Sequence, residues 1–144
     1  MPGRALGAVH LTGVTGTFIL RVYYEDTDLA GIVYYANYLR FIERARTEWI
    51  RDLGIDQTAL RDATGIVFAV RRIEADYLCP ARFDEVLEVR TSLVALTAAR
   101  ILLAQTVWRA ATLLFEARVT LVCLTPRGTP TRLPAEVRAR LAPG

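Results

Sequence analysis

The chain of 144 residues contains no lysine, because all eighteen of its basic residues are arginine. A lysine Schiff base and a phosphate-binding loop built on a lysine are therefore both excluded. The one histidine is His10, near the N-terminus, so a Ser-His-Asp or Cys-His arrangement within one chain is not expected. The same scarcity argues against a histidine-based metal site, and we predict no metal and no cofactor.

Cysteines and long apolar runs are also scarce. Cys79 and Cys123 both lie in strand-like apolar runs, which predicts reduced, buried thiols rather than a disulfide or a metal site. No segment approaches the ~20 apolar residues that cross a bilayer. The N-terminus makes a poor signal peptide, so we expect a cytoplasmic protein without a membrane span.

The charge is mild, at +3, and the arginines are scattered along the chain. This distribution argues against a nucleic-acid partner and leaves an anionic small molecule as a candidate ligand. An apolar content of 53% over this length predicts one globular domain with its own core. We expect a flexible tail over residues 1–15 and a single domain over residues 16–144.

One helix dominates the pattern, at residues 36–53. Apolar side chains recur there at steps of three or four, while charged residues fill much of the remaining surface. Gly54 stands where a left-handed residue would end the helix. The residues of the apolar stripe are Tyr38, Ile42, Ala45, Trp49 and Leu53.

Most of the remaining elements are strands, recognised by a period of two. Residues 113–124 alternate most clearly, with an apolar face and a polar face, as in an antiparallel sheet buried on one side. Such a sheet must cover the helix stripe, so we predict an α+β fold in which an antiparallel meander curls around the helix. Strands are expected at 18–24, 66–78, 85–96, 99–109 and 113–124, and short helices at 57–63 and 134–141.

The chemistry concentrates between the first strand and the long helix, where Glu25, Asp26 and Asp28 precede Ala30-Gly31. Three interpretations remain open for these acids. Asp28 caps a solvated turn; Asp26 and Asp28 hold a divalent cation; or one of them is a catalytic carboxylate. A helix start supplies unpaired N–H groups and partial positive charge, so a carboxylate beside it could act on a carbonyl while the oxyanion is stabilised.

The residues that follow are candidates for contacts to a ligand, and the tyrosines and Asn37 each have a second interpretation. Gly31 would let another group approach the backbone closely. Tyr34, Tyr35 and Tyr38 line the helix entry, where they are either core aromatics or ligand contacts. Asn37 either completes a cap or makes a polar contact to a ligand.

The run RVYYEDTDLAGIVYYANYLRFIERARTEW, from Arg21 to Trp49, resembles the acyl-CoA thioesterases of the hotdog superfamily. It is most similar to the 4-hydroxybenzoyl-CoA thioesterase family and, within it, to the branch encoded beside the Tol–Pal genes of Gram-negative bacteria. The resemblance extends through the segments 74–77 and 80–85 and covers most of residues 19–135.

The resemblance implies a long central helix wrapped by a curved antiparallel sheet. It also implies a homodimer with a joined sheet, often paired into a homotetramer, with active sites at the dimer interface. The family's catalytic carboxylate, which acts as nucleophile or as general base, falls on Asp28. The family's oxyanion donor, a backbone N–H at the helix start, falls on Tyr35.

The predicted contacts to an acyl-CoA substrate surround these two residues. They are Gly31, Ile32, Val33, Tyr34, Asn37 and Tyr38, with Arg71, Arg72, Arg82 and Arg100 as candidates for the CoA phosphates. Two of these positions depart from the resemblance. Close Tol–Pal-associated relatives often carry histidine where this chain has Tyr35, and relatives commonly carry a small hydroxyl residue where it has Arg100.

An acyl-CoA thioester hydrolase is the predicted function. The alternative within enzymes is a dedicated 4-hydroxybenzoyl-CoA thioesterase. The alternative outside enzymes is a hotdog module that binds acyl-CoA or acyl carrier protein without turnover. The sequence leaves the acyl chain open, and also leaves open whether Asp28 attacks the thioester or activates water.

Overall fold

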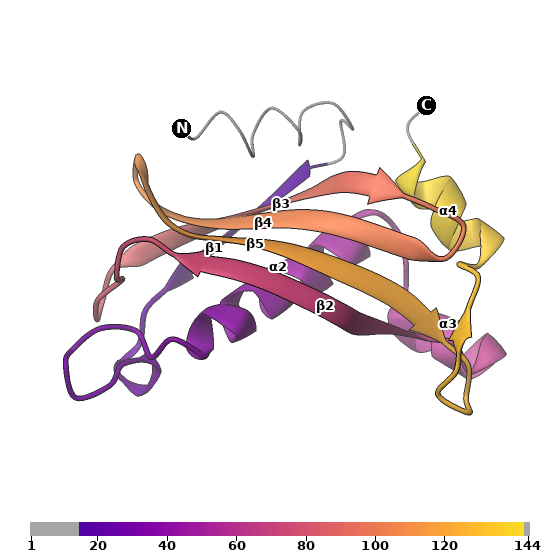
Figure 1. The fold of residues 1–144 in the computed structure, drawn as a ribbon, viewed down its shortest axis with the longest axis horizontal. Coiled ribbons are helices and arrows are strands. Elements are labelled where there is room, and N and C mark those ends of the chain that lie inside the picture. Colours follow the sequence, from indigo (N-terminus) through magenta and orange to yellow (C-terminus); the bar gives the residue numbers. More distant parts are fainter. Residues whose placement is uncertain (1–14, 143–144) are drawn as a thin grey trace.

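The computed structural model describes residues 15–142, and Figure 1 shows one long helix lying across a curved antiparallel sheet. Hydrogen bonds join five strands in the order β1-β3-β4-β5-β2, and the short β6 pairs with β5. The elements are β1 Thr15–Arg21, η1 Tyr24–Asp26, α2 Asn37–Asp52, α3 Gln57–Thr64, β2 Val67–Tyr77, β3 Val86–Leu96, β4 Arg100–Arg109, β5 Thr112–Leu124, β6 Pro130–Thr131 and α4 Ala135–Leu141.

The helix stripe forms the core as predicted. Four of its five members are buried, and Leu53 packs partly buried against the core. Gly54 ends the helix with φ of 87°, the left-handed conformation expected of it. Three further side chains on α2 are also buried, namely Phe41, Arg46 and Ile50. The apolar face is therefore wider than one stripe, because the curved sheet covers more of the helix.

Two predictions about the strands were wrong. The first strand ends at Arg21 rather than at Tyr24, because the chain turns there into the 3-10 helix η1. The meander is also incomplete. β3, β4 and β5 follow one another, but β2 pairs with β5 at one edge and β1 pairs with β3 at the other. Length and alternation predict a strand, but its neighbours depend on tertiary packing.

Within residues 15–142, both β1 and β2 therefore have one edge that pairs with no other strand. β2 is long and largely exposed, and its register shifts between Val70 and Arg72. Of the tail predicted at residues 1–15, only Thr15 lies within the described residues, where it begins β1. Within residues 15–142, no helix is long and apolar enough to span a membrane.

Candidate active site

The acidic turn between β1 and α2 folds back on itself as a small hairpin. Thr27 bridges to Val33, and the Asp28 N–H donates to the Ile32 carbonyl at 3.0 Å. Gly31 makes the bend with φ of 78°, a conformation that favours glycine. The hairpin places the acids of residues 25–28 alongside the segment that leads into α2.

The two aspartates of the turn have different surroundings. Asp26 is buried, at 9% exposure, and its carboxylate accepts the Tyr23 N–H at 2.8 Å, which caps η1. The Asp26 carbonyl accepts the Tyr34 N–H and the Asn37 amide. Asp26 therefore ties the turn to the first residue of α2.

Asp28 points outward from the hairpin. It is exposed, and its Oδ1 accepts the Ala30 N–H at 2.9 Å within the turn. Among the described residues it forms no ion pair. Asp28 therefore caps the turn, as one interpretation expected, and its carboxylate stays accessible to a ligand. Residues 15–142 contain no group of three or more His, Cys, Asp or Glu side chains placed to hold a metal ion.

The start of α2 offers free N–H groups. The N–H of Asn37 donates to the Tyr34 carbonyl, and that of Tyr38 to the Tyr35 carbonyl. Within the part of the chain that the structure describes, the N–H groups of Tyr35 and Ala36 donate to no backbone or side-chain acceptor. These donors sit at the positive end of a 16-residue helix, where negative charge is stabilised.

The tyrosines of the helix entry divide between surface and core. Tyr34 and Tyr35 are exposed, with ring centroids 4.9 Å apart, and the hydrogen bond with Tyr35 raises the pKa of Tyr34. Tyr38 is buried, stacks on Phe115 at 5.1 Å and accepts the Ala81 N–H. Burial raises the pKa of Tyr38, so its phenol stays neutral. Tyr38 supports the site from beneath and presents no surface to a ligand in the single chain.

Tyr77 joins β2 to the helix start, a role that sequence reasoning did not identify. Its hydroxyl donates to the Tyr35 carbonyl at 3.1 Å, and its ring packs edge-on against Tyr35, Tyr38 and Phe115. A hydrogen bond to one side of a peptide group polarises the N–H on the other side, which here belongs to Ala36. No local pattern marks Tyr77, because the contact spans 42 residues.

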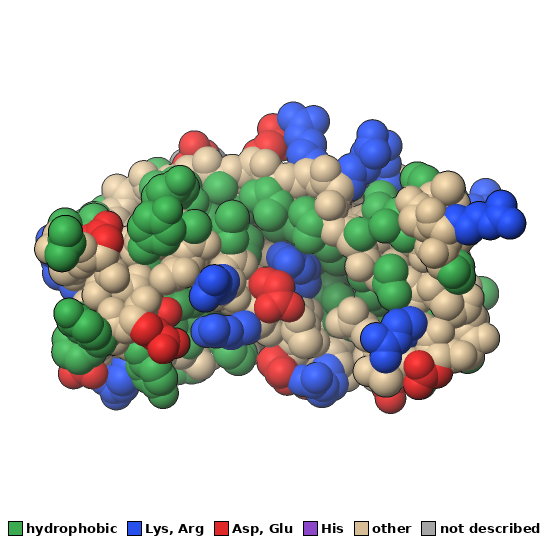
Figure 2. Space-filling view, turned by 90° about the horizontal axis from the view of Figure 1, so that it is seen from below, with side chains coloured by type: hydrophobic (Ala, Val, Ile, Leu, Met, Phe, Trp, Pro, Cys, Tyr) green, Lys and Arg blue, Asp and Glu red, His purple; other side chains and the backbone are tan. Residues whose placement is uncertain are grey.

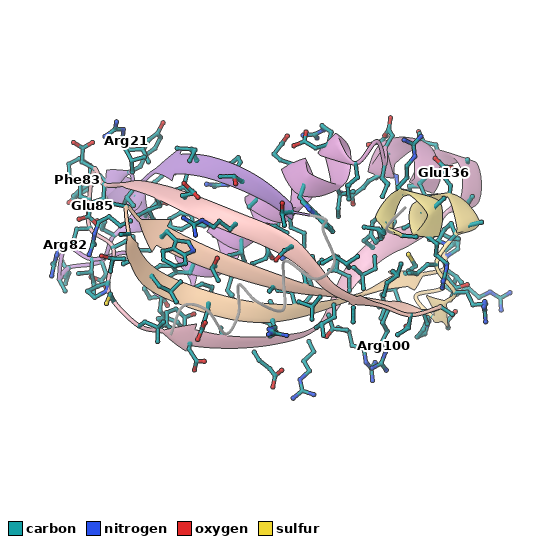
Figure 3. The ribbon with its side chains drawn as sticks, turned by 90° about the horizontal axis from the view of Figure 1, so that it is seen from above. Arg21, Arg82, Phe83, Glu85, Arg100 and Glu136 are labelled. Carbon is teal, nitrogen blue, oxygen red and sulfur yellow. The ribbon has the colours of Figure 1, made fainter. Side chains whose placement is uncertain are left out.

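The four candidate arginines do not converge in one chain. Arg82 lies with Phe83 and Glu85 at the end of the molecule that carries the acidic turn, where it bridges to Ile32, whereas Arg100 lies far from them (Figure 3). Arg71 and Arg72 are exposed on β2, where Arg72 pairs with Glu74 at 3.0 Å. A single chain therefore supplies Arg82 beside the turn but not Arg100.

The surface around the acidic turn is apolar. Hydrophobic side chains gather at the left end in Figure 2, the end where Figure 1 places the turn. Leu29 is fully exposed, and Tyr24 packs edge-on against Phe83 although both are exposed. Ile32 is half-buried and Val33 buried. Exposed apolar area of this kind commonly marks an interaction surface.

Comparison with known proteins identifies the family. The model of the thioesterase-like superfamily matches residues 22–141. This chain belongs to that superfamily. The match includes the hairpin, α2 and every strand of the sheet except β1, so the predicted thioesterase family is confirmed, while the Tol–Pal branch stays a prediction.

Similar proteins support this assignment. The acyl-CoA thioester hydrolase YbgC of Escherichia coli is 42% identical over 122 residues, which cover 83% of this chain and 90% of that protein. The solved structure of a probable thioesterase from Bartonella henselae is 36% identical, with a TM-score of 0.80 over 83% of this chain and 99% of that one. A 4-hydroxybenzoyl-CoA thioesterase, solved with 4-hydroxybenzoyl-CoA, shares the fold, at 22% identity and a TM-score of 0.84 over 90% and 99% of the two chains. The hotdog fold is thereby confirmed.

Proposed function

We propose that this protein hydrolyses acyl-CoA thioesters, releasing CoA and a carboxylic acid. Its membership of the thioesterase-like superfamily and its similarity to a YbgC named for this reaction support the proposal. The observation that carries it is local: an accessible carboxylate, Asp28, lies on the hairpin that leads into α2, and before the helix the N–H groups of Tyr35 and Ala36 lack acceptors among the described residues.

The proposed chemistry follows from these two groups. Asp28 either removes a proton from water, whose oxygen then attacks the thioester carbon, or attacks that carbon itself to form an anhydride that water later cleaves. In both routes the carbonyl oxygen becomes an oxyanion held by the Tyr35 N–H, the C–S bond breaks, and CoA leaves as a thiol after gaining a proton. Neither route requires a metal or a redox cofactor.

The active site that we propose needs a second copy of the chain. Asp28, Leu29 and Tyr35 are exposed in the single chain, although thioester chemistry benefits from excluding bulk water. Pairing two β2 edges antiparallel would join the sheets and bring opposite strand ends together. Tyr77 at one end of β2 would then approach the partner at the end where Arg100 lies. In this arrangement the partner subunit's Arg100 would contact a CoA phosphate near Arg82.

The remaining parts of the function stay predictions. We expect Gly31, Ile32, Val33, Tyr34 and Asn37 to surround the thioester and the acyl group, with Arg71 and Arg72 beside the joined edge. A homodimer that pairs into a homotetramer, association with the Tol–Pal system and a cytoplasmic location are proposed on the resemblance.

The test is CoA release from a panel of short aliphatic, long aliphatic and aryl-CoA thioesters, together with an acyl carrier protein thioester. Wild type is compared with Asp28→Asn and with Asp56→Asn. Asp56 is a matched control, because it is an exposed aspartate whose Oδ1 also accepts a nearby backbone N–H, that of Ala59 at 3.0 Å. We expect turnover to fall only in Asp28→Asn.

The panel also decides between the alternatives. Turnover confined to 4-hydroxybenzoyl-CoA would indicate a dedicated aryl-CoA enzyme. Binding of acyl-CoA or acyl carrier protein without CoA release would indicate a binding module. Equal turnover in wild type and Asp28→Asn would exclude Asp28 as the catalyst.

A further inference from the structure

Arg46 is a buried cation on α2. It is 8% exposed, and it lies among core residues on the face of α2 that packs against the sheet. Its Nη1 donates to Gln105 Oε1 at 2.8 Å. The Gln105 amide in turn donates to the Ile42 carbonyl at 2.9 Å and to the Thr91 hydroxyl at 2.8 Å. Every member of this network apart from Arg46 is neutral.

Arg46 forms no ion pair within the structure described, although the carboxylate of Glu43, three residues earlier on α2, lies near enough to attract it. Gln105 is its one hydrogen-bond acceptor among residues 15–142, and it forms no ion pair with any carboxylate in that range. A guanidinium carries five N–H donors and stays charged in proteins, and a buried charge is costly unless it is paired. Burial lowers the pKa of Arg46, and the nearby Glu43 only partly opposes this effect.

A cavity adjoins this cation. Its volume is about 220 Å³, and its lining combines Glu43, Arg46 and Thr47 with the apolar residues Ile50, Phe68 and Val70. The volume suits a group of several heavy atoms, and the lining offers both apolar side chains and the Arg46 side chain. Arg46 follows Tyr35 by eleven residues, or about 16 Å along the helix at ~1.5 Å per residue. The cavity is therefore distinct from the Asp28 site of the same chain.

We propose that this cavity binds a small carboxylate whose oxygens accept the free N–H donors of Arg46. Arginine presents paired donors that match a carboxylate, and the apolar side chains of the lining suit a short carbon chain. Glu43 accepts the Thr47 hydroxyl at 2.7 Å on the same cavity. Its negative charge limits affinity, because like charges repel across a partly buried space.

The carboxylate has two sources. It is either a free carboxylic acid or the far end of an acyl group presented by a second copy of the chain. The second source rests on the proposed function. β2 supplies Phe68 and Val70 to the cavity and is also the proposed dimer edge, so antiparallel pairing would bring the partner's Tyr77 end of β2 towards it.

Binding is tested by titrating the protein with butyrate and with butyramide, its uncharged analogue, and by following affinity calorimetrically. Arg46→Met should weaken the binding of butyrate at least tenfold, the usual effect of losing a charged hydrogen-bond partner. Glu43→Gln should tighten the binding of butyrate severalfold, because it removes the repelling negative charge. Arg44→Met is the matched control, since it removes the same charge from an exposed position on the same helix. Arg44→Met should leave the affinity for butyrate unchanged.

A second variant guards against misfolding of Arg46→Met. Ala69 also lines the cavity, and Ala69→Ile fills space while leaving Arg46 in place, so it should weaken butyrate as well. Equal affinity of wild type for butyrate and butyramide would overturn the proposal. Unchanged butyrate affinity in a folded Arg46→Met would do the same, and so would unchanged affinity in Ala69→Ile.

The source is decided by turnover of malonyl-CoA relative to butyryl-CoA. If Arg46→Met lowers this ratio about tenfold, the carboxylate is the end of an acyl group. If the ratio stays constant while butyrate affinity falls, the ligand is a free acid. No saturable butyrate binding together with a constant ratio would refute the proposal. The binding arm needs no hydrolysis, so failure of the hydrolase proposal would be seen separately.

Discussion

Asp26 and Asp28 lie two residues apart in the acidic turn, yet Asp26 is held by the fold and Asp28 is exposed to solvent. Asp26 is buried. Its carboxylate accepts the Tyr23 N–H, and its carbonyl accepts the Tyr34 N–H and the Asn37 amide. Asp28 is exposed, and among the described residues its hydrogen bonds stay within its own turn. The contrast supports the catalytic role that we propose for Asp28, because the fold uses the carboxylate of Asp26 and leaves that of Asp28 accessible, although both are aspartates of one turn.

Neutralising Asp28 and removing the Asp26 carboxylate should have opposite effects on turnover and on stability. Asp28→Asn should lower turnover of the preferred acyl-CoA by a factor of about one hundred or more, because a positioned acid–base group typically contributes that much. Its free energy of unfolding should stay within about 0.5 kcal/mol of wild type, as for most surface substitutions. Steady-state CoA release and urea denaturation measure the two effects. A variant that is destabilised as strongly as it is slowed would contradict the assignment.

Asp26→Ala should show the opposite balance. It removes the acceptor of the Tyr23 N–H and so the cap of η1, while the bonds of the backbone carbonyl to Tyr34 and Asn37 remain, and it should lower the free energy of unfolding by about 2 kcal/mol. Turnover per folded molecule should fall less than in Asp28→Asn. Urea denaturation gives the stability, and activity is normalised to the folded fraction. The comparison fails if Asp26→Ala folds normally but is the slower enzyme.

Two glycines allow the position of Asp28 to be tested without substituting a carboxylate. Gly31 and Gly128 both have positive φ, at 78° and 81°, and an added Cβ meets nothing within 4 Å at either position. Substitution by alanine should therefore cost about 1 kcal/mol of stability at both, from backbone strain alone. Only Gly31→Ala should also reduce kcat, because it displaces Asp28. Equal kcat in the two variants would show that the bend does not position the carboxylate.

The smallest expected effect concerns the helix start. Tyr77→Phe removes the hydroxyl that donates to the Tyr35 carbonyl and keeps the ring packing. The loss of one such hydrogen bond costs about 1 kcal/mol. Because this bond polarises the Ala36 N–H, the neighbour of the proposed oxyanion donor Tyr35, kcat should fall no more than a fewfold, with KM nearly unchanged. Tyr23→Phe is a suitable control, since Tyr23 is also exposed and contributes its backbone N–H to the cap. A change in KM alone would place Tyr77 in substrate binding instead.

Much of this protein is determined by its sequence. The helix period of residues 36–53, the glycine that ends it and the alternation of residues 113–124 predict the helix and the strands, because these signals depend on neighbours within a few positions. The same local signal places acids before a helix start, which predicts a carboxylate able to act on a carbonyl. That the carbonyl belongs to an acyl-CoA thioester follows only from the resemblance, and the site residues stay a prediction. The scarcity of histidine and the lack of lysine restrict the chemistry further.

Tertiary structure alone decided the rest. The pairing of β2 with β5, the hydroxyl of Tyr77 on the Tyr35 carbonyl and the network of Arg46 with Gln105 all join residues far apart in sequence. Their partners are chosen by how the sheet curves around α2, and no local pattern encodes that choice. Burial likewise separates Asp26 from Asp28, because a carboxylate is committed to the fold only when packing removes it from water.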